Sequence, residues 1–167
     1  MNNNIYLIGF MGCGKTTIGH QVAIKIQSEF IDLDREIENR EKASIPHLFK
    51  MQGEDYFREV ESLVLLQTKE RQGCVIATGG GTVSKEINRE FLKRQKTIYL
   101  EWDFDTLYER IKNDSNRPNV KSYGQLEELY ESRLSFYESA GTYCINCENK
   151  SRDEIVLEII SGLGGEL

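Results

Sequence analysis

Residues 9–17 read GFMGCGKTT and contain the glycines, lysine and hydroxyl groups that bind the phosphates of nucleoside triphosphates in many proteins. Gly9, Gly14, Lys15 and Thr16 fit the pattern G-x-x-x-x-G-K-[ST], between an apolar segment predicted as a strand and a predicted helix. Glycines let successive backbone amides approach phosphate oxygens, and the positive end of the helix dipole faces the anion. We expect Lys15 to reach the β- and γ-phosphates and Thr16 to bind Mg²⁺. The candidate nucleotide-binding residues are Gly12, Cys13, Gly14, Lys15, Thr16 and Thr17.

Two aspartates lie at the end of a second predicted strand, in the segment FIDLD at residues 30–34. Because side chains alternate along a strand, we expect Asp32 and Asp34 to point in different directions. One can face a metal ion and the other can face the group that accepts a phosphoryl group. An aspartate at a strand end commonly holds Mg²⁺ through water. The pair alone does not decide the matter, because such residues are also common as helix caps.

An arginine and three consecutive glycines are further candidates for an acceptor site. Arg58 lies in the segment GEDYFREVE, where the neighbouring glutamates favour a surface ion pair if the arginine is considered alone. Gly79, Gly80 and Gly81 follow a buried predicted strand. A helix cap needs one glycine at most, and three in a row cost conformational entropy. We therefore interpret the triplet as a place where the backbone approaches a ligand closely.

A long polar segment, KNDSNRPNVKS at residues 112–122, separates two predicted helices. Loops of this length inside compact domains are usually functional or disordered. Arg117 precedes Pro118, which places a cation on a semi-rigid turn. We interpret residues of about 112–124 as a lid that closes over the nucleotide, excludes water and brings Arg117 to the phosphates. Arg133, on the predicted helix after the lid, is an additional candidate.

The composition is that of an ordinary globular protein and limits the classes of ligand. The chain of 167 residues corresponds to about one domain, and its net charge of −6 argues against a broad surface for nucleic acid or membrane. The apolar run at residues 5–11 is too short for a signal peptide or a membrane span, so we expect a cytoplasmic protein with reduced cysteines. Cys144 and Cys147 form a C-x-x-C pair, but no second pair or nearby histidine completes a zinc site.

Predicted strands and helices alternate along the chain. We expect strands at residues 4–8, 30–33, 74–77, 97–101 and 143–145, and helices from about 15, at 35–41, from 44 with a second segment after Gly53, and at 84–94, 104–111, 125–139 and 152–161. This alternation predicts an α/β fold, a parallel sheet with helices on both faces. Ligands of such sheets bind at the carboxyl ends of the strands. The phosphate loop, the aspartate pair and the glycine triplet each follow a strand, so we expect them to meet in one site.

Together these motifs resemble those of the shikimate kinase family. The segments GFMGCGKTTIG, FIDLD, GEDYFREVE and ATGGGTV carry the resemblance, and the Arg-Pro pair of the lid and SRLSFYESA extend it over nearly the whole chain. The combination of the last three segments separates this group from nucleoside monophosphate kinases. The resemblance implies a P-loop fold, a three-layer sandwich whose five-stranded parallel sheet has the order 2-3-1-4-5. It also implies a monomer and a single domain over residues 1–167, with acceptor-binding helices at about 34–62.

The resemblance further implies ATP-dependent phosphorylation of the 3-hydroxyl of shikimate, giving shikimate 3-phosphate and ADP, in chorismate and aromatic amino acid biosynthesis. By this resemblance Asp34 holds the acceptor hydroxyls and serves as the base, and Lys15 and Arg117 stabilise the transferred phosphoryl group. Asp32 completes, with Thr16, the shell of the cofactor Mg²⁺. The other implied contacts are those of the shikimate carboxylate with Arg58 and Arg133, of the ring hydroxyls with the backbone of Gly79, Gly80 and Gly81, and of adenine with Arg152, which matches the family position only approximately.

Two other functions are compatible with part of this pattern. A gluconate kinase shares the fold and the phosphate loop, and gluconate is also a hydroxy acid, so an arginine–aspartate acceptor site alone does not exclude it. The glycine triplet and the FREVE helix favour shikimate over gluconate. A nucleotide-dependent switch or binding module has no use for a paired-arginine acceptor site, and the chain has no obvious extension for binding an effector.

Overall fold

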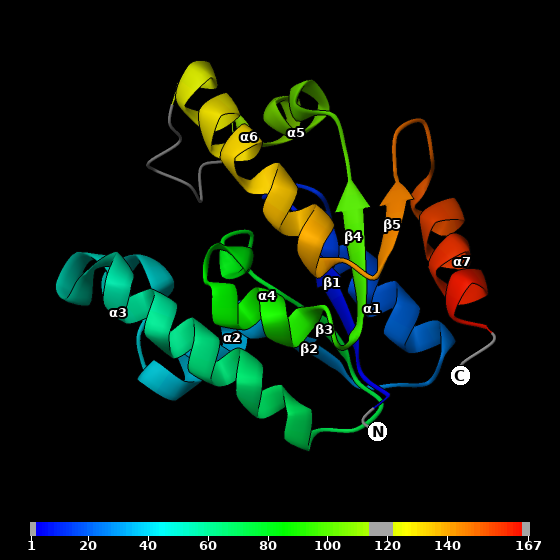
Figure 1. Cartoon of the computed structure of the whole chain (residues 1–167), viewed down its shortest axis with the longest axis horizontal. Helices are drawn as coiled ribbons and strands as arrows, with labels where there is room; N and C mark the ends of the chain where they lie inside the picture. The colour runs from blue at the N-terminus through cyan, green and yellow to red at the C-terminus, as the bar shows by residue number, and fades with distance from the viewer. Residues whose placement is uncertain (1–2, 114–121, 165–167) are drawn as a thin grey trace.

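A five-stranded parallel sheet organises the computed structural model, which describes residues 3–113 and 122–164 (Figure 1). The strand order is β2-β3-β1-β4-β5, and this confirms the predicted α/β fold and order. The strands are β1 (Ile5–Ile8), β2 (Phe30–Asp32), β3 (Val75–Ala77), β4 (Lys96–Glu101) and β5 (Tyr143–Asn146).

The central strands have almost continuous apolar sequences because both faces of the sheet are covered. All four residues of β1 and all three of β3 are buried, as expected for strands in the middle of a parallel sheet. Ile5 pairs with Val75 of β3 on one side and with Lys96 of β4 on the other. This register brings the carboxyl ends of β1 and β3 to the same edge, where the phosphate loop and the glycine triplet begin.

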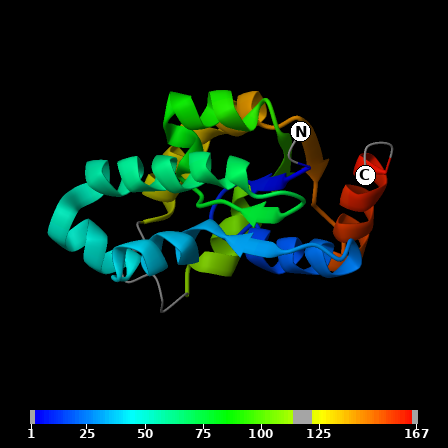
Figure 2. The same cartoon turned by 90° about the horizontal axis from the view of Figure 1, so that it is seen from below.

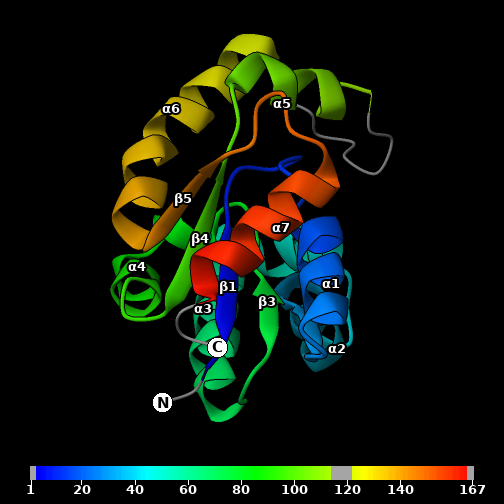
Figure 3. The ribbon, with the colours of Figure 1, turned by 90° about the vertical axis from the view of Figure 1, so that its right-hand side faces the viewer.

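Helices cover both faces of the sheet, which makes the predicted three layers (Figure 3). Helices α1 and α7 contact each other on one side of the sheet, and α4 contacts both α3 and α6 on the other. The helices are α1 (Lys15–Lys25), α2 (Leu33–Glu41), α3 (Ile45–Gln67), α4 (Glu86–Leu92), α5 (Phe104–Ile111), α6 (Tyr123–Ala140) and α7 (Arg152–Leu163), with 3-10 turns η1 (Thr68–Glu70) and η2 (Thr82–Ser84).

The prediction that Asp34 lies on a strand end is wrong. Strand β2 ends at Asp32, whose side chain accepts a hydrogen bond from the Asp34 backbone amide at 3.1 Å and caps α2. The FIDLD segment therefore turns into a helix two residues earlier than the sequence predicts, because an aspartate at this position satisfies a free amide of the first helical turn. Asp34 lies in that first turn, and its position is set by the capped helix.

The predicted break at Gly53 is present as a kink inside α3. Gly53 has φ 84° and ψ 172°, a conformation outside the helical region that a residue with a Cβ rarely adopts. Helices α2 and α3 contact each other and project together beyond the sheet (Figure 2). Arg58, in the second segment of α3, and Asp34, in the first turn of α2, line the same cavity.

The segment after the glycine triplet also differs from its prediction. A helix was expected at 84–94, but the chain forms η2 first and α4 starts at Glu86. Two side chains of α4 hold the turn: Asn88 Nδ2 donates to the Thr82 carbonyl at 2.8 Å, and Arg89 Nη1 donates to the Val83 carbonyl at 2.7 Å. These tertiary hydrogen bonds stabilise a turn that helix propensity does not reveal.

Candidate active site

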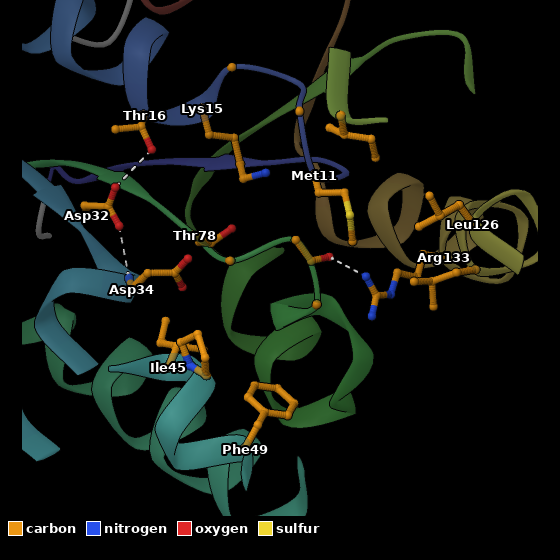
Figure 4. Close-up of a pocket in the computed structure, with 18 of the residues that line it drawn as sticks. Met11, Lys15, Thr16, Asp32, Asp34, Ile45, Phe49, Thr78, Leu126 and Arg133 are labelled. Carbon is orange, nitrogen blue, oxygen red and sulfur yellow. Dashed lines mark hydrogen bonds between the residues drawn. The ribbon is translucent and has the colours of Figure 1, made fainter. Parts of the chain in front are cut away.

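A cavity of about 1070 Å³ lies at the carboxyl edge of the sheet, and motifs far apart in the sequence meet there (Figure 4). Its wall comes from the phosphate loop, the start of α2, the two segments of α3, the glycine triplet and α6. The predicted residues that line it are Gly12, Gly14, Lys15, Thr16, Thr17, Asp32, Asp34, Arg58, Gly79, Gly80, Gly81 and Arg133.

The phosphate loop turns into α1 at Gly14, which has φ 88° and precedes the first helical residue, Lys15. No side chain caps this helix, so the free amides of its first turn and the positive end of its dipole are available to an anion. The Lys15 ammonium is held within the loop, where it donates to the carbonyls of Gly9 at 2.7 Å and Phe10 at 3.1 Å. The loop thus places a buried cation beside a set of amides that can bind phosphate oxygens.

Thr16 and Asp32 bring two oxygen groups together beside Lys15. The Thr16 hydroxyl donates to Asp32 Oδ2 at 2.9 Å (Figure 4). Hydroxyl and carboxylate oxygens fit Mg²⁺, which keeps several waters and takes few ligands from the protein. The residues present therefore fit this ion. Within residues 3–113 and 122–164 no group of three His, Cys, Asp or Glu side chains is placed to hold a metal by itself.

Asp34 points into the cavity and has a strongly altered acidity (Figure 4). Its pKa is raised to about 6, mainly by burial; the negative charges of Asp32 and Glu61 act in the same direction, and the positive charge of Lys15 opposes them. At neutral pH most molecules therefore carry an ionised Asp34 that binds a proton far more readily than an ordinary aspartate. This is the behaviour required of a general base.

Arg58 is held in the cavity wall by a buried glutamate. Its Nη1 donates to Glu61 Oε2 at 2.7 Å, one turn along α3, and the Glu61 side chain is fully buried. The other carboxylate oxygen of Glu61 accepts a hydrogen bond from the Thr82 hydroxyl at 2.6 Å. Arg58 also makes a longer ion pair, at 3.4 Å, with the largely exposed Glu54, so part of the surface pairing that the sequence suggests is present. Glu61, in addition, connects the arginine to the turn that follows the glycine triplet.

The glycine triplet packs against other parts of the site. A Cβ on Gly79 would lie 2.8 Å from Glu61 Oε1, and a Cβ on Gly81 would overlap the Arg58 guanidinium. A Cβ on Gly80 would lie 3.2 Å from the Met11 amide of the phosphate loop. The glycines thus allow close packing against protein groups, and the close approach to a ligand stays a prediction.

Helix α6 contributes two polar side chains that reach the triplet. Arg133 Nη1 donates to the Gly80 carbonyl at 3.4 Å, and the Tyr137 hydroxyl donates to the same oxygen at 2.5 Å. Arg133 and Arg58 approach the cavity from different helices, and both line it. Two arginines, one proton acceptor and a phosphate loop therefore share a single cavity.

The chain is similar in sequence and fold to known proteins. The family model described as shikimate kinase matches residues 11–163. The shikimate kinase of Staphylococcus haemolyticus is 42% identical over 165 residues, which cover 97% of this chain and 95% of that protein. The chain belongs to the shikimate kinase family. A structure of the Acinetobacter baumannii shikimate kinase in complex with shikimate has a TM-score of 0.91 and 37% identity, covering 100% of this chain and 96% of that one.

The resemblance to a gluconate kinase extends only to the fold. A gluconokinase from Sinorhizobium meliloti covers 98% of this chain and 92% of its own with a TM-score of 0.65, but the identity is 17%. The chain is a kinase of the shikimate kinase family, with the P-loop α/β fold of its structural neighbours. Among the helices that the structure describes, none has the length and apolar character needed to cross a membrane.

Three predicted residues of this shikimate kinase family member lie elsewhere or are not described. Cys13 is buried and does not line the cavity. Its sulfur lies 3.4 Å from Lys15 Nζ, its amide donates to the Phe10 carbonyl at 3.3 Å, and its carbonyl accepts from Trp102 Nε1 at 3.1 Å. Arg152 is the first residue of α7, is exposed and does not line the cavity. Arg117 lies outside the described residues.

Some residues near the site belong to no sequence motif. Glu61 and Tyr137 are polar residues among several others on their helices, and only their burial distinguishes them from solvated neighbours. Arg110 is another such residue: its guanidinium lies 3.8 Å above the Trp102 ring and donates to the Gly12 carbonyl at 3.3 Å. An arginine of α5 thus offers a flat cation beside the phosphate loop.

The C-x-x-C pair consists of free thiols, exposed at Cys144 and buried at Cys147.

Proposed function

We propose that the protein transfers the γ-phosphoryl group of ATP to the 3-hydroxyl of shikimate, giving ADP and shikimate 3-phosphate on the route to chorismate and the aromatic amino acids. The main support is that one cavity contains a phosphate loop together with Asp34, Arg58 and Arg133. A small polyol carboxylate needs cations for its carboxylate and an acceptor for a hydroxyl proton. A nucleotide acceptor needs a base pocket and more cations for its phosphates.

On the donor side, the loop holds the triphosphate. The backbone of Gly12, Cys13 and Gly14 and the hydroxyls of Thr16 and Thr17 bind phosphate oxygens. Lys15 leaves its carbonyl partners to stabilise the negative charge of the transferred group. The sequence supports Arg117 of the lid as a second cation and Arg152 as a contact of the adenine.

On the acceptor side, Arg58 and Arg133 bind the shikimate carboxylate, while the backbone of Gly79, Gly80 and Gly81 contacts the ring hydroxyls. These contacts orient the 3-hydroxyl toward the γ-phosphoryl group, and positioning of this kind supplies much of the rate in phosphoryl transfer. Asp34 accepts the hydroxyl proton as the oxygen–phosphorus bond forms and ADP departs. Its raised pKa, about 6, suits a group that must take up and release a proton near neutral pH.

We propose Mg²⁺ as the cofactor, held by the Thr16 hydroxyl and, through water, by Asp32. When bound, the ion neutralises charge on the phosphate oxygens. The distance of 2.9 Å between Thr16 Oγ1 and Asp32 Oδ2 supports this assignment, because the two groups can share one small cation.

The organisation of the chain is part of the proposal. A single domain over residues 1–167 comprises the core, acceptor-binding helices at about 34–62 and a lid at about 112–124. We propose that it works in the cytoplasm as a monomer on the small molecules ATP and shikimate, without nucleic acid or membrane as a partner. The net charge of −6 supports the last point.

A coupled assay of ADP release tests the proposed reaction. The purified protein is given ATP and Mg²⁺ with shikimate, gluconate or nucleoside monophosphates in parallel, and the product is identified by mass. We expect ADP release that depends on shikimate and yields shikimate 3-phosphate. Lys15→Met should abolish it, whereas Lys25→Met, at the exposed end of the same helix, should not. Turnover with gluconate that exceeds turnover with shikimate would refute the proposal.

A further inference from the structure

The middle carbonyl of the glycine triplet is held from outside the loop. The Gly79 and Gly81 carbonyls accept hydrogen bonds from the backbone amides of Thr82 at 3.2 Å and Ser84 at 3.0 Å, within the local turn. The Gly80 carbonyl instead accepts from Tyr137 and Arg133, which lie one turn apart on α6. The conformation of the triplet at Gly80 therefore depends on a helix more than fifty residues further along the chain.

The hydrogen bond to this carbonyl also fixes an amide. The peptide group between Gly80 and Gly81 is planar and trans, so its C=O and N–H point in opposite directions. A donor that holds the Gly80 oxygen on the side of α6 therefore turns the Gly81 N–H away from α6. Among the described residues, the Gly79, Gly80 and Gly81 amides have no hydrogen-bond acceptor, while all three glycines line the cavity. These amides are free to bind a ligand.

Of the two donors, Tyr137 is the one that we expect to keep its hydrogen bond to the Gly80 carbonyl when a ligand binds. Its side chain is fully buried, and its ring stacks on Tyr99 of β4 at 5.2 Å between centroids and 16° between planes. Burial raises the pKa of its hydroxyl far above neutral, so the group remains a protonated donor. Arg133 lines the cavity and makes the longer bond. If Arg133 turns to a carboxylate ligand, Tyr137 alone retains the Gly80 oxygen.

We propose that Tyr137 is a positioning residue for the acceptor substrate: by holding the Gly80 carbonyl, it aims the Gly81 amide at the hydroxyls of shikimate. This inference rests on the proposed function. Three consecutive glycines have wide conformational freedom, and they have no side chains with which to fix their own peptide planes. The hydroxyl of Tyr137 supplies that constraint. The Tyr137 ring stacks on Tyr99 of β4, and this contact holds the hydroxyl in place relative to the sheet.

The variant Tyr137→Phe removes the hydroxyl and keeps the ring. We expect the KM for shikimate to rise about tenfold, as for the loss of one buried hydrogen bond, and the KM for ATP to stay within about twofold. Tyr6→Phe is the matched control, because Tyr6 is also fully buried and its hydroxyl bonds to Thr68 Oγ1 at 2.8 Å, outside the cavity wall. It should lower the melting temperature and leave both KM values within about twofold.

Two kinetic results would overturn the proposal: a KM for shikimate that rises no more in Tyr137→Phe than in Tyr6→Phe, or equal rises in the KM values for shikimate and ATP, which indicate general loosening. These outcomes are distinct from failure of the proposed function, in which the unmodified protein itself does not phosphorylate shikimate.

A second measurement needs no variant. In protein labelled with ¹⁵N-glycine, shikimate should shift the amide resonance of Gly81 at saturation. An unchanged Gly81 resonance contradicts the proposal even if Tyr137→Phe fails to fold.

Discussion

Asp34 illustrates how a single side chain acquires its chemistry from its surroundings. The first helical turn of α2 holds it in the cavity wall, where burial and the charges of Asp32 and Glu61 oppose its ionisation. Lys15 is the cation that partly offsets them. The carboxylate thus remains reactive toward a proton because no group in the described structure fully neutralises its charge.

We predict that Asp34→Asn lowers kcat by about 100-fold or more, because an amide cannot accept the hydroxyl proton. Steady-state kinetics with saturating ATP measure this effect. Asp55→Asn, an equal charge change at an exposed site in α3, serves as the control and should leave kcat within about twofold. Full activity of Asp34→Asn would exclude Asp34 as the base.

The same substitution should stabilise the fold at neutral pH. With a pKa raised to about 6, Asp34 binds protons more tightly in the folded protein than in the unfolded chain, so its contribution to stability falls as pH rises through about 4–6. We expect the free energy of unfolding of Asp34→Asn at about pH 7.5 to exceed that of the unmodified protein by about 1–3 kcal/mol. Urea unfolding at about pH 7.5 and about pH 5 tests this, with a smaller difference expected at the lower pH.

Activity should depend on pH through this group. Because the base must be ionised before it can accept a proton, kcat/KM for shikimate should fall as pH decreases through about 6. At low pH, the plot of log(kcat/KM) against pH should have a slope of about 1, as expected for the titration of one group. A profile that stays flat down to about pH 4.5 would show that a carboxylate of ordinary acidity, or none, serves as the base.

At the scale of elements, α3 does more than present Arg58. The i,i+3 spacing of Arg58 and Glu61 puts a cation and its buried partner on one face of the helix, and Thr82 joins that partner to η2. The helix and the turn therefore hold the arginine and the glycine triplet in a common arrangement. Removal of one member of a buried ion pair is destabilising because the other charge is then left buried without a partner.

We predict that Glu61→Gln raises the KM for shikimate about tenfold and lowers the free energy of unfolding by about 2–4 kcal/mol, because Arg58 loses its buried counter-charge. Kinetics and urea unfolding measure the two effects. Glu54→Gln is the matched control: Glu54 is the other carboxylate partner of Arg58, at 3.4 Å, but its side chain is 63% exposed. Its removal should change stability by less than about 1 kcal/mol. Equal effects of the two variants would contradict the role assigned to Glu61.

At the scale of the whole molecule, the parallel sheet brings the donor and acceptor residues to one edge. The phosphate loop follows β1, the aspartates lie at the junction of β2 and α2, and the glycine triplet follows β3. Helix α6, beyond β4, brings Arg133 to the same place. Residues more than a hundred positions apart therefore act on ligands in one cavity.

A shared cavity with separate subsites predicts separable stabilisation by ligands. Shikimate at about 100 times its Kd should stabilise the fold by about 2.7 kcal/mol, which raises Tm by about 5–10 °C for a chain of this size. Arg58→Ala should reduce this shift to below about 2 °C and preserve the shift caused by a non-hydrolysable ATP analogue. Arg94→Ala, whose side chain is 76% exposed, should keep both shifts. Loss of both shifts in Arg58→Ala would argue against separate subsites.

The fold class, the phosphate loop and the meeting of the motifs at one edge of the sheet can be predicted from the amino-acid sequence. Alternating strands and helices require a parallel sheet, and a glycine-rich turn followed by Lys15 has a local physical reason that needs no knowledge of distant residues. The break at Gly53 can also be predicted from local sequence, because few residues other than glycine adopt its backbone angles.

The partners of these residues, in contrast, become visible only in the folded molecule. The burial of Glu61, the hydrogen bond from Tyr137 to Gly80 and the raised pKa of Asp34 depend on which elements pack together. The start of α2 at Leu33 also depends on the hydrogen bond that the Asp32 side chain accepts from the Asp34 amide at the end of β2. Local sequence sets backbone preference, but the energy of a buried polar group is set by neighbours that the fold brings from far along the chain.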